Sequence, residues 1–140
     1  MSQKIIRIEH KFGEGLWRAE NENRKTVIEK HPNHDFIYQT HCDKNKFPTF
    51  YEDKELRKKF FEKFKNDNNI YDILVTYFFA FKNIDQLKDA LSTTDLKYCL
   101  KNLDFKVLLL EVKDFIESPF QIIFKKEDII NSEDISFMFL

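Results

Sequence analysis

The sequence predicts a single α+β domain over residues 1–140, in which a small, twisted, mostly antiparallel sheet packs against two or three helices. A chain of 140 residues has the length of one domain with one core. Hydrophobic residues make up 42% of the chain and include sixteen phenylalanines, which is enough apolar material for that core. Strand-like segments cluster late and helix-like segments interrupt them in the middle, so a doubly wound sheet with strict alternation is not expected.

The first strand is expected at residues 4–11, KIIRIEHK. Alternation along a strand places Arg7 and His10 on opposite faces, because they are an odd number of residues apart. The two side chains can share one pocket only if the strand bulges or ends between them. Two interpretations stay open: Arg7 and His10 line a pocket, or Arg7 is solvated and His10 lies at the edge of the core.

The segment after this strand is predicted to be a loop and then a long irregular stretch. In FGEGLWR, Trp17 can stack on the ring of a ligand while Arg18 meets a phosphate, or Trp17 can fill the core. Residues 31–50 show no periodicity, and long irregular loops are functional more often than average. The histidines and Cys42 in this stretch do not have the spacing of a standard zinc site, so no metal is expected.

The middle of the chain alternates helix and strand signals. Residues 52–67 carry an apolar stripe at helical spacing, and residues 71–81, YDILVTYFFAF, read as a buried strand. Asn83 and Ser92 each resemble the N-cap of a short helix. The second of these helices has Cys99 on its apolar side, where a buried thiol is expected.

The last third of the chain is predicted to hold three strands. These are FKVLLLEV at residues 105–112, QIIFKK at residues 121–126 and DISFMFL at residues 134–140. The helix of residues 52–67 also carries a candidate partner-binding set of cations: Arg57, Lys58, Lys59, Lys63 and Lys65. Such a patch can contact RNA, DNA or an acidic protein surface, or it can be a solvated face neutralised by the acidic residues interleaved with it.

Charge and targeting signals limit the setting of the protein. The net charge is −1, so the molecule as a whole favours no particular partner. The first residues contain no apolar segment of signal-peptide length, and no run has the length of a membrane-spanning helix. Two cysteines are too few for a disulfide scaffold. We therefore expect a reduced, cytoplasmic setting and no membrane contact.

Several motifs in order resemble a family of small uncharacterised phage and bacterial proteins. The chain starts with RIEH and a glycine–aromatic–arginine turn, and its middle carries HCDKNKFPTFYED, with His41, Pro48 and Asp53 at the similar positions. FKNIDQLKDAL, FKVLLLEV and QIIFKKEDI follow in the same order as in that family. The resemblance covers most of the chain.

The layout is also similar to the ADP-ribosyltransferase-like fold. That resemblance implies NAD as a cofactor, with Arg7 or His10 at its ribose and Tyr77 or Phe81 near its nicotinamide. It places Gln121 at the late position where the fold carries a catalytic glutamate. A neutral amide brings no negative charge to steady an oxocarbenium-like centre. Glu117 is the nearby carboxylate in the sequence.

Two hypotheses about function result. In the first, the chain is a phage or mobile-element binding protein without a cofactor that inhibits a host defence target, such as a CRISPR effector or another nucleoprotein, in the host cytoplasm. In the second, it is an NAD-consuming enzyme that uses His10, Arg7 and Gln121 or Glu117. A cleft that brings Arg7, His10 and Gln121 together would favour the enzyme. A flat basic or aromatic patch around residues 57–65 would favour binding, with a host protein or an RNA as partner.

Overall fold

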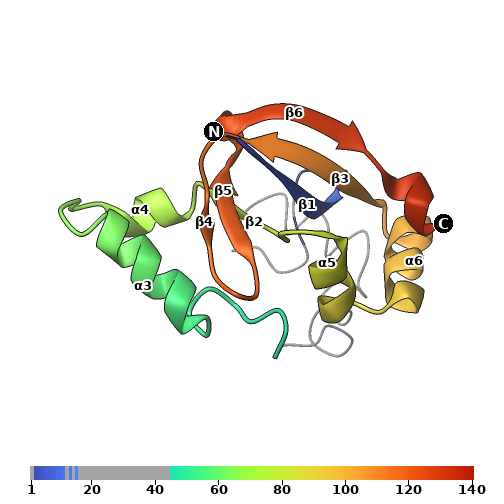
Figure 1. Ribbon diagram of the computed structural model, residues 1–140, viewed down its shortest axis with the longest axis horizontal. Coiled ribbons are helices and arrows are strands. Elements are labelled where there is room, and N and C mark those ends of the chain that lie inside the picture. Colours follow the sequence, from blue (N-terminus) through green and yellow to red (C-terminus); the bar gives the residue numbers. More distant parts are fainter. Residues whose placement is uncertain (1, 12, 14, 16–44) are drawn as a thin grey trace.

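The computed structural model describes residues 2–11, 13, 15 and 45–140, and these form two small antiparallel sheets with helices on both outer sides (Figure 1). The first sheet has the order β1–β3–β6 and the second β2–β5–β4. The strands are β1 (Gln3–His10), β2 (Tyr77–Ala80), β3 (Phe105–Val112), β4 (Ile116–Glu117), β5 (Ile122–Lys125) and β6 (Ile129–Asp134). The helices are α3 (Lys54–Lys63), α4 (Ile70–Leu74), α5 (Ile84–Ala90) and α6 (Thr93–Asn102), with short 3-10 turns η2 (Lys126–Asp128) and η3 (Ser136–Phe139). The α+β class is thus confirmed, while the expectation of one sheet is replaced by two.

In the part of the chain that the structure describes, one bridge joins the two sheets. Ile6 of β1 exchanges backbone hydrogen bonds of 2.8 and 2.7 Å with Phe81, the residue after β2. The sheets then pack face to face through Ile5, Leu110, Ile122 and other buried residues. Because β1 has neighbours on both faces, Arg7 and His10 are buried together with the isoleucines between and beside them.

The helices cover the two outer faces. Helices α5 and α6 and the η3 turn pack on the first sheet through Ile8, Leu96, Val107 and their neighbours. Helices α3 and α4 pack on the second sheet, where Leu56 and Phe60 lie against Tyr77 and Ile123. In Figure 1 these two helix pairs lie at opposite ends of the molecule.

Both predicted helix caps are confirmed. The Asn83 side chain accepts a hydrogen bond from the Gln86 N–H at 2.9 Å, and the Ser92 side chain accepts from the Asp95 N–H at 3.2 Å. Cys99 is fully buried on α6, and burial raises the pKa of its thiol to about 12. It is therefore a neutral core residue at physiological pH.

The expectation of one strand over residues 71–81 is wrong in its first half. Ile70, Ile73 and Leu74 have helical spacing and all pack against the α3 core, so they form the short helix α4. The Thr76 hydroxyl donates to the Ile73 carbonyl at 2.6 Å, which closes this helix before β2 begins. Val75, in the turn between the two, is 54% exposed.

The expected strand over residues 134–140 is also wrong. The strand β6 ends at Asp134, whose carboxylate accepts from the Ser136 N–H at 2.9 Å and begins the η3 turn. Ile135 and Phe139 are buried while Phe137 is exposed, which is the pattern of a helical turn and not of alternation. The two-residue strand β4 is a further element that the sequence pattern does not predict.

Candidate functional site

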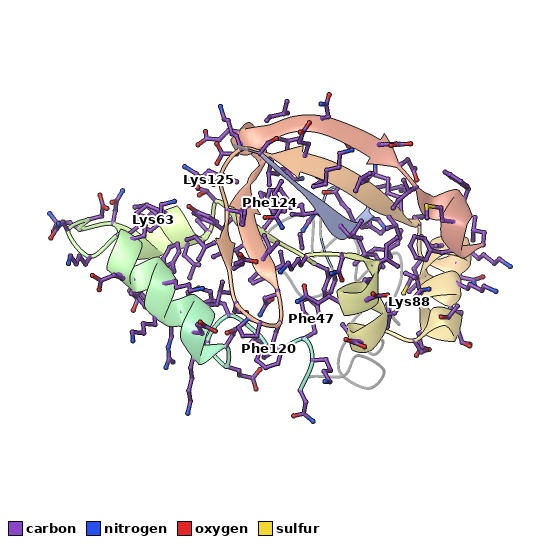
Figure 2. The ribbon with its side chains drawn as sticks, in the orientation of Figure 1. Phe47, Lys63, Lys88, Phe120, Phe124 and Lys125 are labelled. Carbon is purple, nitrogen blue, oxygen red and sulfur yellow. The ribbon has the colours of Figure 1, made fainter. Side chains whose placement is uncertain are left out.

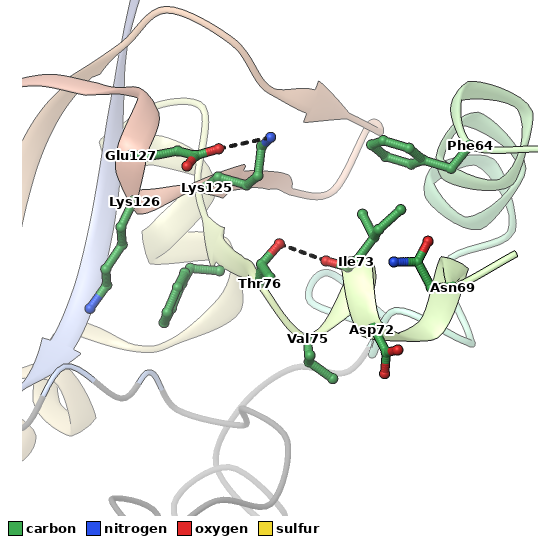
Figure 3. A pocket seen from close by; sticks show the side chains of 10 residues that line it. Phe64, Asn69, Asp72, Ile73, Val75, Thr76, Lys125, Lys126 and Glu127 are labelled. Atoms are coloured by element: carbon green, nitrogen blue, oxygen red, sulfur yellow. Dashed lines mark hydrogen bonds and ion pairs between the residues drawn. The ribbon is translucent and has the colours of Figure 1, made fainter. Parts of the chain in front are cut away.

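A groove opens between the α4–β2 turn and the end of β5, with a volume of about 640 Å³ (Figure 3). Its lining residues come from four neighbouring segments: Phe64, Asn69, Asp72, Ile73, Val75, Thr76, Phe78, Lys125, Lys126 and Glu127. The α4 side presents three apolar side chains (Phe64, Ile73 and Val75) beside three polar ones (Asn69, Asp72 and Thr76), and the β5 side presents two lysines and a glutamate. This combination suits a partner that offers both an apolar group and a charged group.

Lys125 is held in place on the charged wall. Its Nζ lies 3.0 Å from the Glu127 carboxylate and 5.9 Å from the centre of the Tyr77 ring. The hydrogen bond to Glu127 raises the pKa of Lys125. Burial raises the pKa of Tyr77, against the opposing effect of Lys63 and Lys125. At neutral pH the pair is therefore a cation beside a neutral phenol.

Arg7 lies fully buried behind this groove. Its Nε donates to Glu9 Oε1 at 2.9 Å, its Nη1 to the Phe79 carbonyl at 2.6 Å and its Nη2 to the Gly13 carbonyl at 3.0 Å. The interpretation of Arg7 as a solvated residue is thus wrong. The guanidinium ties β1 to β2 and to the loop that follows β1.

Phe78, which lines the groove, is contacted by two cations. The Arg7 guanidinium is 5.1 Å from the centre of its ring, and Lys126 Nζ is 4.4 Å from it. Lys126 also lies 3.3 Å from Glu9 Oε1, so that one carboxylate oxygen serves both cations. The position of this part of the groove wall therefore depends on Arg7 and Glu9.

The loop that follows β1 approaches the two cations at Gly13 and Gly15. Gly13 has a positive φ of 91°, and a Cβ there would lie 2.9 Å from Lys126 Nζ. A Cβ on Gly15 would lie 3.4 Å from the Arg7 guanidinium. The positive φ favours glycine at position 13, whereas the contact at Gly15 is an ordinary van der Waals distance.

The structure places Arg7, His10 and Gln121 in three separate surroundings. His10 packs edge-on against Phe105, with ring centres 5.4 Å apart, on the face of β1 opposite Arg7. The Gln121 amide donates to the Pro48 carbonyl at 2.8 Å and to Asp53 at 3.0 Å. Neither the groove nor the hollow beside Glu111 is lined by any of these three residues, and their proposed catalytic role stays a prediction.

Gln121 belongs to a buried polar network that fixes the start of α3. Asp53 caps this helix by accepting from the Leu56 N–H at 3.1 Å, and it also accepts from the Ser118 hydroxyl at 2.5 Å. Ser118 in turn accepts from the Gln121 N–H at 3.3 Å. The network joins α3 to the turn between β4 and β5.

The five cations of the basic helix lie at the α3 end of the molecule, and most of them have local partners. Lys63 pairs with Asp114 at 2.9 Å, Lys65 with Glu62 at 3.1 Å, and Lys59 with Glu55 at 3.7 Å. The hydrogen bond from Lys63 lowers the pKa of Asp114. Arg57 donates to the Tyr51 carbonyl, and Lys58 is exposed. Figure 2 shows Lys63 and Lys125 on the same side of the molecule.

The other residues that were predicted to bind a ligand are Tyr77, Trp17 and Arg18. Tyr77 is buried against Phe60 of α3 and contacts two residues of the groove: its ring centre lies 6.1 Å from that of Phe64 and 5.9 Å from Lys125 Nζ. Trp17 and Arg18 lie outside the described residues, as do His31, His34, His41 and Cys42. The groove itself was not predicted from the sequence; its one signal there is the pair Lys125–Lys126 after a buried strand.

The chain belongs to a phage protein family. The family model for the bacteriophage T4 Y00F protein matches residues 1–138, so the chain is a member of that family. This confirms the phage part of the resemblance, while the likeness to ADP-ribosyltransferases has no support in the comparisons. No curated protein and no solved structure matches the chain. In the described ranges, no helix has the length and apolar character needed to cross a bilayer.

Proposed function

We propose that this phage protein binds a protein of the host cell through the groove and inhibits it, with a component of a host defence system, such as a CRISPR effector, as the target. The observation that carries the proposal is the groove: an exposed Val75 and the aromatic Phe64 face two lysines across it. Aromatic and apolar anchors surrounded by a polar rim are typical of a protein-binding surface. Membership of a phage family supports a host target.

A protein partner is favoured over RNA by the state of the cations. Lys59, Lys63 and Lys65 are paired with carboxylates of the chain, and Lys125 and Lys126 are paired with Glu127 and Glu9. Phosphate contacts would have to displace these partners, whereas an apolar segment can dock without breaking them. Tyr71, on the neighbouring helix α4, adds a further exposed aromatic ring at this end of the molecule.

The first test is the substitution Val75→Glu. The new carboxylate would be buried against an apolar group of the partner, which costs at least about 2 kcal/mol of binding free energy. The measurement is the plating efficiency of a defence-sensitive phage on defence-bearing cells that express the protein. Wild type should restore plating, and Val75→Glu should not.

The matched control is Met138→Glu. Val75 is 54% exposed and Met138 is 55% exposed, but Met138 lies in the η3 turn, away from the groove. This variant should restore plating as wild type does. Plating restored by Val75→Glu at equal protein levels would show that the groove is not the binding surface. Failure of the wild-type protein to restore plating against any of the defence systems tested would contradict the inhibitory function.

A further inference from the structure

Strand β6 forms an open edge of the first sheet. It is the last strand in the order β1–β3–β6, and its residues from Ile130 to Asp134 are all exposed. Figure 1 shows it along the outer rim of the molecule. These residues are separate from those that line the groove. An exposed edge strand offers unpaired backbone groups to another extended chain.

The register identifies which backbone groups point outward. The Ile135 N–H donates to the Val107 carbonyl at 2.9 Å, so residue 135 faces β3. Glu133 and Asn131, which pair with Leu109 and Glu111, have the same parity and also face β3. The N–H and C=O groups of Ser132 and Asp134 therefore point away from the sheet.

The surface beside this edge carries two carboxylates, Glu111 and Glu133, and one cation, Lys4. A hollow of about 340 Å³ is lined by Lys4, Leu109, Glu111, Asn131, Ser132 and Glu133. Glu111 is bound by the Ser2 hydroxyl at 2.7 Å and the Asn131 amide at 2.9 Å, and these hydrogen bonds lower its pKa. The Glu133 carboxylate has no hydrogen-bond or ion-pair partner among the described residues. It is available to a cation from outside.

We propose that β6 is a docking edge for an extended segment of a partner protein that carries arginine or lysine at alternate positions. Its backbone would pair with Ser132 and Asp134 and add a strand to the first sheet. Alternate side chains of such a strand point to one face, so its cations would lie beside Glu133 and the hollow. A second copy of this chain fits less well, because its own β6, IINSED, would bring only further carboxylates.

The test uses three synthetic peptides and fluorescence anisotropy at physiological salt. The first alternates arginine with threonine, the second replaces arginine by glutamate, and the third keeps arginine but has N-methylated backbone amides on one edge. The first should bind. The other two should bind at least about tenfold more weakly, the second through charge and the third through lost backbone pairing.

Two variants locate the binding on β6. Ser132→Pro removes an outward N–H without removing a bond to β3, and Glu133→Lys reverses the charge with the backbone intact. Both should weaken binding of the first peptide at least about tenfold, while Lys58→Ala on α3 should not. Circular dichroism checks that Ser132→Pro is folded.

Three results would overturn the proposal. Equal binding of the N-methylated peptide would show attraction by charge alone. Unchanged binding by Glu133→Lys would place the peptide elsewhere. A wild-type dimer in analytical ultracentrifugation that Ser132→Pro dissociates would make the occupant of β6 a second copy of the chain.

Discussion

Replacing Arg7 with methionine is expected to lower the free energy of unfolding by about 3–5 kcal/mol, as is usual when one partner of a buried ion pair is removed. The guanidinium is 1% exposed and bonds to Glu9 and to the Phe79 and Gly13 carbonyls. Methionine fills much of the space but forms none of these hydrogen bonds: the Phe79 carbonyl loses its bond to Arg7, while Glu9 and the Gly13 carbonyl keep Lys126 at 3.3 Å. Urea denaturation followed by circular dichroism measures the effect.

The control for this prediction is Arg57→Met on α3. Arg57 is half-buried, and its side chain makes one described hydrogen bond, to the Tyr51 carbonyl at 3.1 Å. Its loss should cost less than about 1 kcal/mol. Equal effects of the two substitutions would contradict the view that Arg7 fixes β1, β2 and the wall of the groove.

Truncating Phe60 to alanine is also expected to have a large effect, lowering the free energy of unfolding by about 3–5 kcal/mol. The ring is fully buried and contacts Phe50, Phe64 and Tyr77, with ring centres 5.4, 4.9 and 5.5 Å apart. The truncation would leave a cavity between α3 and the second sheet. The measurement is again urea denaturation, compared between wild type and variant.

Phe61→Ala is the matched control for Phe60. The Phe61 ring is only half-buried and lies at the outside of the same cluster. Its centre is 6.3 Å from the centre of the exposed Tyr71 ring. Its truncation should cost less than half as much, because a partly exposed site leaves no closed cavity. A larger loss of unfolding free energy for Phe61→Ala than for Phe60→Ala would contradict the structure, in which Phe60 is fully buried and Phe61 is only half-buried.

The sequence pattern predicts those elements whose signal is local. The caps at Asn83 and Ser92 and the long strand over residues 105–112 depend on neighbouring residues, and all three are confirmed. The segment 71–81 failed because a short apolar run fits a strand and a buried helix equally well. Ile73 and Leu74 pack against α3, and this packing favours the helix over the strand. The sequence alone does not show which residues will pack together.

The candidate site could be predicted only in part for the same reason. Periodicity correctly places Arg7 and His10 on opposite faces of β1, but it does not show that both faces are covered. The burial of Arg7 results from a second sheet whose strands lie more than seventy residues later in the chain. The groove likewise joins α4 to the end of β5, and only the tertiary structure brings these together.

Site-specific photo-cross-linking can show whether the groove binds a host protein in the cell. A photoreactive amino acid would replace Val75 in the groove or Phe137 in the η3 turn, both of them exposed. The protein would be irradiated in host cells that carry the targeted defence system. We expect a defined adduct with one host protein from position 75 and none from position 137. The same adduct from both positions, or none from position 75, would contradict this expectation.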